Sequence, residues 1–400
     1  MLLSIITPIH GDSKYLPELW ESVKNQTYHN WELVLVPNNG GNTHGIEKDP
    51  RVKVYPVENP KKSIGLVKRH ACQNAKGEIL VELDSDDLLT PTALEEIAKA
   101  FINPKVSFIY SNFCEFYFDH PTLKDWESPR YDSAYGWRYR DYEWQGHKLN
   151  ECLDFEPVPS SFAMIWFAPN HVRAWRTKDY WAVGGHNPDL EAVDDFDLEL
   201  RTYLYGQFHH IDKCLYLYRI NGQNQWIQKN KYIQETARNI ADQYMDRIAY
   251  RWAELNGHKT INIQDIEHLN EKWDIPDNSV GIIKAWDRFN LCKDPIHIMS
   301  EIYRVLVPGG WLLSSTVSTT GNGAWMDPRN KSYWNEYSFE YYIDKTMAPF
   351  IGNNKIRFQE IRRKDYFPSQ WHQDRNIHYV LFNGIALKDG MPRLPGQQKI

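Results

Sequence analysis

The 400-residue sequence lacks the features that mark several special classes of protein. It contains no apolar run near the roughly 18 residues that a membrane-spanning helix needs. Its five cysteines are scattered without a Cys-x-x-Cys pair and are odd in number, which argues against a disulfide framework or a zinc site. It also lacks an excess of positive charge, since its net charge of -6 gives no general attraction to nucleic acid or anionic membranes. These absences favour a cytoplasmic, soluble globular protein with reduced thiols.

The sequence is instead rich in apolar and aromatic residues. Hydrophobic residues make up 42% of the chain, which contains 16 tryptophans and 24 tyrosines. Aromatic rings can stack on sugars or bases, although filling a core is the expected role of most of them. A chain of this length predicts about two or three domains, with ample apolar residues to build their cores.

One apolar run ends abruptly in three carboxylates. Residues 79–83 are typical of a buried strand and are followed by Asp84, Asp86 and Asp87. Carboxylates at the C-terminal end of such a strand lie where open α/β sheets bind ligands. The Asp-x-Asp spacing suits Mg²⁺ or Mn²⁺, which then bind substrate phosphates. An alternative left open by the spacing is that Asp86 and Asp87 cap a helix that begins near Thr90.

The first hundred residues alternate between strand and helix patterns. We expect strands at 2–8, 31–37, 52–57 and 79–84, and helices at 16–25 and 64–75. This order predicts an α/β fold with a mostly parallel sheet. Right-handed crossovers would bring Pro8 to His10, Asn38–Asn39 and Asp84 to Asp87 together in one crevice.

Several short motifs, taken in order, resemble family 2 glycosyltransferases with the GT-A (Rossmann-like) nucleotide-sugar-binding fold. They are Ser4–His10, Leu19–Tyr28, Trp31–Val36, Gly77–Asp87, Pro91–Leu94, Val183–Gly185, Asp194–Arg201 and Leu217–Arg219. The resemblance covers about residues 1–240. It implies a nucleotide-sugar donor, most simply a UDP-sugar, a Mn²⁺ or Mg²⁺ ion, and transfer with inversion to a hydroxyl of a glycan or another acceptor.

The resemblance also implies a nucleoside pocket at the ends of the first two strands. Pro8, Ile9 and His10 would line this pocket. Asn39 lies where the family usually has an aspartate that hydrogen-bonds the base. An amide can both donate and accept hydrogen bonds, so Asn39 could still recognise a pyrimidine.

Charged residues would hold the diphosphate end of the donor. By resemblance, Asp84 would contact the ribose and Asp86 the metal, and both are candidate metal ligands. Asp87 would support them or cap a helix. Lys68 or Arg69 would face the diphosphate or the carboxylates, although an ordinary solvated helix face is the alternative for both.

Two adjacent carboxylates, Asp194 and Asp195, precede a second helical pattern. The resemblance aligns Asp195 with the family's catalytic aspartate and Asp194 with a position that is usually a glutamate. Neighbouring carboxylates raise one another's pKa, which would help a catalytic base. The alternative is an N-terminal helix cap that interacts favourably with the helix dipole.

The acceptor side is less well marked. The weak candidates are His186, Trp166 and Arg219. The family often has a histidine near position 221 that helps bind metal or phosphate, and Asn221 replaces it here, so a third metal ligand is open. The aromatic and arginine-rich stretch Tyr131–Trp144 could stack on sugars or bases, or could be a packed insertion.

A long helix pattern at 233–257 is expected to link residues 1–232 to a second, smaller α/β domain at 258–400. Residues 274–280, 294–295 and 299–313, continued by 325–328, 332–336 and 338–342, resemble the C-terminal half of class I SAM-dependent methyltransferases, and Arg304–Gly310 is the most specific match. That family cradles its cofactor on a glycine-rich turn after the first strand, yet no Gly-x-Gly occurs between Gly257 and Pro276. The resemblance therefore implies an incomplete methyltransferase-like domain that does not use SAM. Such a domain could pack against the rest of the chain, form a homodimer or bind the acceptor.

The motifs together favour a metal-dependent inverting glycosyltransferase. A bifunctional glycosyltransferase and methyltransferase is one alternative, and the missing glycine-rich turn argues against it. A non-catalytic nucleotide-sugar-binding protein is another, and the two carboxylate pairs argue against it. A nucleic-acid acceptor is possible but disfavoured by the acidic charge balance.

Overall fold

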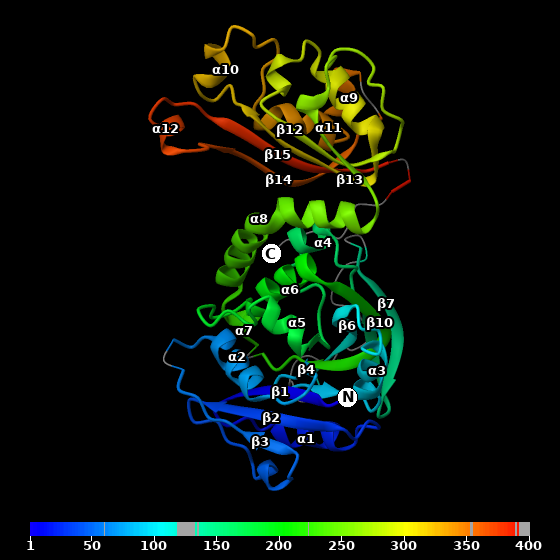
Figure 1. Cartoon of the computed structure of the whole chain (residues 1–400), viewed down its shortest axis with the longest axis vertical. Helices are drawn as coiled ribbons and strands as arrows, with labels where there is room; N and C mark the ends of the chain where they lie inside the picture. Colours follow the sequence, from blue (N-terminus) through cyan, green and yellow to red (C-terminus); the bar gives the residue numbers. More distant parts are fainter. Residues whose placement is uncertain are drawn as a thin grey trace. The chain divides into compact units, whose positions relative to one another are not determined.

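The computed structural model describes residues 1–59, 61–117, 133, 136–222, 224–352, 355–388 and 390–391. The chain forms two compact units (Figure 1), with the main boundary between Tyr244 and Met245. This boundary falls inside helix α8 (Asn230–Leu255), within the segment expected to be a linker. The assignment of domains by function stays a prediction. No described helix is both long and apolar enough to cross a membrane.

The first half of the N-terminal unit is a parallel sheet flanked by helices. The elements here are β1 (Leu3–His10), α1 (Leu16–Lys24), β2 (Trp31–Asn38), η1 (Ile46–Lys48), β3 (Val52–Val54), α2 (Ile64–Asn74) and β4 (Ile79–Glu82). β1 lies between β2 and β4 and is parallel to both, with His10 beside Asn38 and Ile6 beside Glu82. The predicted alternation of strands and helices and the parallel pairing are confirmed, because each element has a clear local pattern of apolar residues.

The second half of this unit makes the sheet mixed. Its elements are β5 (Leu88–Leu89), α3 (Ala93–Ala100), β6 (Val106–Phe116), β7 (Arg138–Trp144), β8 (His147–Leu153), α4 (Pro159–Met164), β9 (Ala174–Arg176), α5 (Thr177–Ala182), α6 (Asp194–Tyr205), β10 (Gln207–Arg219), α7 (Gln225–Gln228) and α8. The strand order is β3-β2-β1-β4-β9-β6-β10-β5. The short strand β9 is antiparallel to both β4 and β6, whereas β6 and β10 are parallel. The sheet is therefore wholly parallel only from β3 to β4.

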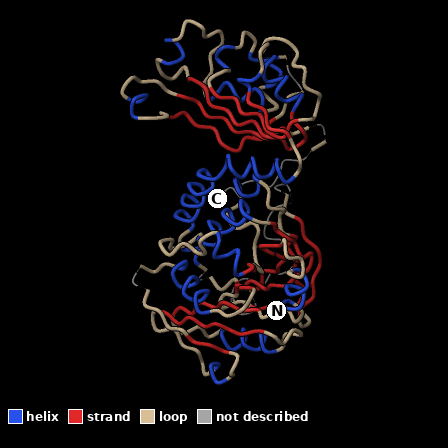
Figure 2. Tube along the Cα trace, in the orientation of Figure 1, coloured by secondary structure: helices blue, strands red, loops and turns tan. Residues whose placement is uncertain are grey.

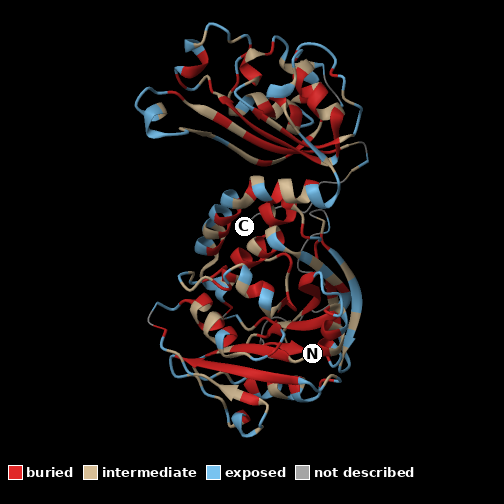
Figure 3. Ribbon diagram, viewed as in Figure 1, coloured by how far each residue is buried: buried red, intermediate tan, exposed pale blue. Residues whose placement is uncertain are grey.

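Burial follows the amphipathic pattern of the sequence (Figure 3). The strand β2 is buried along its whole length, and α1 buries Leu16, Leu19 and Val23 against the sheet. In the aromatic stretch, Trp137 is buried and β7 is largely exposed. Tyr131 and Tyr135 lie outside the described residues.

The second unit has its own five-stranded sheet, drawn in Figure 2 as a separate set of strands. The strand order is β11-β12-β13-β15-β14, in which β11, β12 and β13 are parallel and β15 runs antiparallel to its neighbours. The elements are β11 (Lys259–Asn262), η3 (Ile263–Asp265), β12 (Val280–Trp286), η4 (Phe289–Leu291), α9 (Pro295–Val305), β13 (Leu306–Val317), α10 (Gly323–Met326), η5 (Glu336–Phe339), α11 (Glu340–Ile343), η6 (Ala348–Ile351), β14 (Phe358–Tyr366), α12 (Gln370–Gln373) and β15 (Tyr379–Ala386). Both units are thus α/β, as predicted.

Candidate active site

The loop that follows β4 carries Asp84, Asp86 and Asp87 and is called the acidic loop below. Asp87 links it to β10. This buried carboxylate accepts hydrogen bonds from the Tyr216 hydroxyl and from the backbone N–H of Arg219, both at 2.7 Å. α3 begins only at Ala93. The alternative that Asp86 and Asp87 cap this helix is therefore wrong, and Asp87 instead fixes the loop that carries the other two aspartates.

Asp84 and Asp86 are left partly accessible by this arrangement. Burial raises the pKa of Asp84 and, together with the charge of Asp84, raises the pKa of Asp86 to about 6. Asp86 accepts a hydrogen bond of 2.9 Å from the Asn221 amide. Asn221, which stands where the resembled family often has a histidine, therefore reaches the acidic loop. Two neighbouring carboxylates that resist ionisation are a donor set that a divalent cation would stabilise.

A pocket of about 180 Å³ in the N-terminal unit brings the acidic loop and the start of α6 together. Asp84, Lys68, Arg173 and Asp195 all contribute to its wall. The other lining residues are Ile64, Glu115, Trp166, Phe167, Asn170, His171, Ala192, Val193, Asp194, Tyr218, Gln225, Trp226, Asn230, Ile233 and Gln234. The predicted metal side and the predicted base therefore share one cavity.

Arg173 determines the charge state of the predicted base. Its guanidinium lies 2.5 Å from Asp195 and 2.6 Å from Glu199. Burial opposes ionisation of Asp195, but the charges of Arg173 and Lys68 outweigh it and lower the pKa of Asp195. The expectation that the adjacent carboxylates would raise this pKa is therefore wrong for Asp195. Burial without enough compensating charge raises the pKa of Glu199 well above its usual range.

The alternative for Asp194 and Asp195 is a cap at the N-terminus of α6. Val193 is the residue before the helix and takes the left-handed conformation, with φ of 58°, and no side chain caps the helix. Asp194 and Asp195 instead lie in the first turn, where the helix dipole favours negative charge. Asp195 Oδ1 accepts a hydrogen bond of 2.8 Å from the backbone N–H of Phe196.

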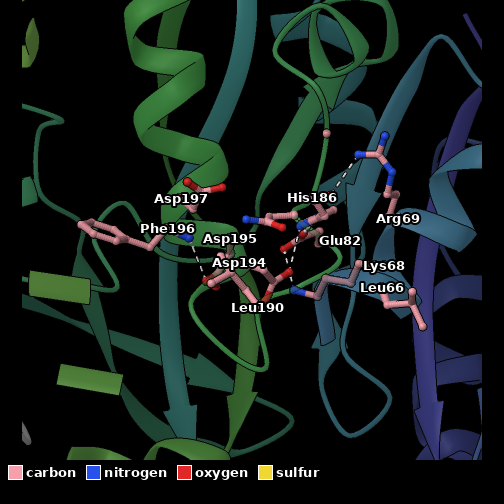
Figure 4. Close-up of polar contacts among 12 residues, drawn as sticks. Leu66, Lys68, Arg69, Glu82, His186, Leu190, Asp194, Asp195, Phe196 and Asp197 are labelled. Carbon is pink, nitrogen blue, oxygen red and sulfur yellow. Dashed lines mark hydrogen bonds and ion pairs between the residues drawn. The ribbon is translucent and has the colours of Figure 1, made fainter. Parts of the chain in front are cut away.

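A buried ionic network lies at the pocket, and two of its members, Lys68 and Asp194, line the wall (Figure 4). Glu82, at the end of β4, contacts Lys68 at 3.2 Å through one oxygen and the His186 ring at 2.9 Å through the other. The second ring nitrogen of His186 lies 2.9 Å from Asp194. All four side chains are almost fully buried. Lys68 thus faces the carboxylates, which is one of the positions predicted for it. The alternative of a solvated helix face is wrong for this residue.

Glu82 is the one member of this network that the sequence reasoning missed. It lies in the apolar run 79–83, which the sequence predicts to be a buried strand. A carboxylate inside such a run is itself a signal, because a buried charge requires a partner.

Other predicted site residues lie elsewhere. Ile9 has its side chain in the core, and only its backbone reaches the sheet edge, where its carbonyl accepts a hydrogen bond of 2.8 Å from Asn38. His10 is exposed, with its ring 3.4 Å from the Asn39 amide. Pro8 is half-buried. The predicted nucleoside residues therefore gather at the β1–β2 edge, and the Ser13 hydroxyl, 3.2 Å from the Ser85 carbonyl, joins this edge to the acidic loop.

Three residues predicted to contact substrate make structural contacts in this fold. Arg69 donates to the backbone carbonyls of Gly184 and His186 and so holds that turn, while its contact with a diphosphate stays a prediction. His186 is buried in the network, so the expected acceptor contact is wrong. Arg219 is also buried, donating to the Asp86 carbonyl at 2.7 Å and to Glu18 at 2.6 Å. Trp166 does line the pocket, and its contact with an acceptor stays a prediction.

Two segments of the chain match models of known protein families. Residues 4–155 match the model of glycosyl transferase family 2. The N-terminal region of this chain contains a family 2 glycosyltransferase domain. Residues 217–314 match a methyltransferase domain model.

Several bacterial proteins are similar to this chain in sequence. Hyaluronan synthase of Pasteurella multocida is 27% identical over 236 residues, which cover 57% of this chain and 21% of that protein. Chondroitin synthase of Escherichia coli is 25% identical over 277 residues, covering 68% of this chain and 35% of that protein. The E. coli UDP-Glc:alpha-D-GlcNAc-diphosphoundecaprenol beta-1,3-glucosyltransferase is 29% identical over 116 residues, covering 28% and 46%. This chain thus spans less than half the length of each relative.

Solved structures with a similar chain path have low sequence identity. S. aureus TarS in complex with UDP-GlcNAc is 17% identical with a TM-score of 0.43, covering 64% of this chain and 73% of that chain. The Pyrobaculum calidifontis mannosyltransferase in complex with GDP-Man and Mn²⁺ is 15% identical with a TM-score of 0.40, covering 64% and 75%.

The methyltransferase-like region differs from the expected cofactor-binding pattern at its first strand. The part of its match before Lys259 forms the end of β10 and the helices α7 and α8. The first strand of the second sheet, β11, leads directly into the 3₁₀ helix η3, and the Gln264 amide from η3 donates to the Trp286 carbonyl at 3.2 Å at the end of β12. Among the described residues of this unit, no glycine-rich turn follows a first strand to cradle a nucleoside cofactor.

Proposed function

We propose that the family 2 domain transfers a sugar from a UDP-sugar to a hydroxyl of a glycan, with inversion at the anomeric carbon. One observation carries this proposal: Asp84 of the acidic loop and the ionised Asp195 line the same pocket. A donor bound at the acidic loop would therefore place its anomeric carbon within reach of an acceptor activated at Asp195.

Asp195 is the proposed general base. Its pKa is held low, so it is ionised at neutral pH and can accept the proton of an acceptor hydroxyl. The hydroxyl oxygen then attacks the anomeric carbon as the bond to the diphosphate breaks. A single displacement of this kind inverts the configuration at that carbon. Arg173 keeps the base oriented and charged through their 2.5 Å contact.

Asp84 and Asp86 are the residues that would hold Mn²⁺ or Mg²⁺. The raised pKa of each carboxylate fits a site completed by a cation. When bound, the ion neutralises the charge that develops on the departing diphosphate. The described residues offer no group of three or more metal-ligating His, Cys, Asp or Glu side chains, so water and diphosphate oxygens would complete the coordination.

The β1–β2 edge is the proposed nucleoside site. His10, Asn39 and Pro8 gather there beside the acidic loop. The name of one relative specifies a UDP-Glc donor, and the names of two others describe hyaluronan and chondroitin synthases, which supports a UDP-sugar donor and a glycan acceptor. Residence in the cytoplasm and dimerisation through residues 258–400 stay predictions.

The proposal is tested with the full chain and UDP-glucose, UDP-GlcNAc and UDP-galactose, each with Mn²⁺ or with EDTA. We expect Mn²⁺-dependent release of UDP from one of them, stimulated by an oligosaccharide acceptor. GDP-mannose serves as the control donor. Absence of release from all three, or release that the Asp195→Asn variant retains in full, contradicts the proposal.

A further inference from the structure

His186 occupies an unusual place for a histidine. Each ring nitrogen lies 2.9 Å from a carboxylate oxygen, one of Glu82 and the other of Asp194. Its backbone N–H donates to the Tyr180 hydroxyl at 3.0 Å, and the ring packs against Tyr180 and Trp175. The imidazole is therefore enclosed, with a carboxylate oxygen in ion-pair contact with each of its nitrogens. Only the protonated ring can donate to both carboxylates at once.

The charges around the ring also favour this proton. Glu82 and Asp194 are almost fully buried, and the partly buried Asp84 and Asp195 act on Lys68 together with them. Lys68 in α2 and Arg173, which directly precedes β9, supply two positive charges. Glu199 adds no further negative charge when it is protonated, which its raised pKa favours. A protonated His186 supplies the third positive charge, and buried charges are stable only when paired.

The position of His186 connects the two chemical ends of the pocket. Glu82 lies two residues before Asp84, and Asp194 lies directly before Asp195. The backbone around His186 is itself held, because Arg69 donates to its carbonyl at 3.0 Å and the Ser63 hydroxyl donates to the Leu190 carbonyl at 2.8 Å. A rigid link from β4 to the first turn of α6 therefore runs through one side chain.

We infer that His186 is a positioning residue, an imidazolium that bridges Glu82 and Asp194 and so fixes the first turn of α6, from which Asp195 meets the acceptor hydroxyl. This inference rests on the proposed function and deepens it. It assigns to His186 no contact with substrate. Loss of the bridge changes where the base points and leaves the β1–β2 edge and the acidic loop, which would bind the nucleotide, in place.

The test compares His186→Gln with His210→Gln. His210 is the control, because it is a partly buried histidine of the same unit that hydrogen-bonds Asn112 at 2.8 Å and stacks on Tyr110, away from Glu82 and Asp194. Each variant is assayed for Mn²⁺-dependent release of UDP from the UDP-sugar that the wild type uses. We expect His186→Gln to lower kcat by about tenfold or more with donor KM changed less than about threefold, and His210→Gln to leave both near wild type.

A double variant separates positioning from a general loss of packing. If His186 acts through Asp194, the double variant His186→Gln/Asp194→Asn should have the same kcat as the less active of the two single variants. The second change then removes an interaction that the first has already broken. Additive losses, or a His186→Gln kcat within about threefold of wild type, overturn the inference. Wild-type protein that releases no UDP and is not stabilised by UDP with Mn²⁺ overturns the proposed function and the inference together.

A readout without activity guards against variants that fail to fold. In the wild-type protein, the ¹⁵N shifts of the histidine rings report protonation directly. We expect the His186 ring to remain doubly protonated at pH 7.5, where an ordinary histidine with a pKa of about 6.5 is mostly neutral. A neutral His186 ring at that pH overturns the inference.

Discussion

Arg173 and Asp195 form a guanidinium–carboxylate pair of 2.5 Å in which the arginine is almost fully buried and the aspartate keeps 17% of its side chain exposed. The exposed part faces the pocket that Asp84 also lines. This pair explains how a carboxylate in a largely buried place can stay ionised. It also makes separate predictions for the two partners, since one would do the chemistry and the other would keep it charged.

Asp195→Asn should abolish most transfer while donor binding survives. An amide of the same size cannot accept the acceptor's proton, so we expect kcat to fall by about 10²–10⁴-fold. UDP binding in the presence of Mn²⁺, measured by calorimetry, should remain near wild type. Asp197→Asn is the matched control, because Asp197 lies in the same turn but pairs with Arg201. An Asp195→Asn variant with wild-type kcat rules out this residue as the base.

Arg173→Met should destabilise the N-terminal unit. The change leaves the ionised Asp195 without its cation in a largely buried place, and breaking such a pair costs about 3–5 kcal/mol. Arg51→Met provides the comparison, because Arg51 pairs with Asp49 near the surface and such pairs contribute about 0–1 kcal/mol. Urea unfolding followed by tryptophan fluorescence measures both. Equal midpoints for the two variants would show that the buried pair does not support the fold.

The parallel strands of the N-terminal unit could be predicted from the sequence because their signals are local. β1, β2 and β4 are apolar runs between polar breaks, and their observed ends lie within two residues of the predicted ones. β5 and β9 could not, since strands of two or three residues have no periodicity of their own. They exist because β10, β4 and β6 offer them hydrogen-bonding partners.

The candidate site divides in the same way. Asp84 and Asp195 follow recognisable patterns, and they do line one pocket. The predicted direction of the Asp195 pKa shift is wrong. The sequence shows that Asp194 is its neighbour, but it does not show that Arg173 contacts Asp195 in the fold. The role of His186 depends on contacts with Glu82 and Asp194 that form only in the folded chain. Charge partners far apart in sequence cannot be read from spacing.

Asn221→His should tighten the binding of Mn²⁺. The Asn221 amide already lies 2.9 Å from Asp86, so an imidazole there could join the two aspartates as a third ligand. Asn221→Gln is the control, because it keeps the amide and adds no nitrogen ligand. The Mn²⁺ dependence of UDP release and Mn²⁺ electron paramagnetic resonance both measure the affinity. Unchanged affinity in the histidine variant would place the metal away from Asp86.

SAM should not stabilise the protein. The second sheet begins at β11 and passes directly into η3, so the cofactor lacks its glycine-rich turn. A ligand at a hundred times its Kd stabilises by about 2.7 kcal/mol, which thermal unfolding detects readily. UDP with Mn²⁺ is the positive control in the same experiment. A rise in Tm with SAM alone would restore the bifunctional alternative.

The stability that His186 contributes should decline as the pH rises. Burial lowers the pKa of His186, but pairing with Asp194 and Glu82 outweighs it, and the folded pKa lies above the unfolded value. The folded protein then holds a proton that the unfolded chain releases, so this stability is complete below the unfolded pKa of about 6.5 and is lost through the folded pKa. Lys68, Arg173, Asp195 and Glu199 face the same cluster, so the wild type must be compared with His186→Gln over pH 6 to 9. We expect the difference in Tm between them to shrink towards the alkaline end. A difference that is constant with pH, or that grows, would mean that the ring is neutral between its two carboxylates.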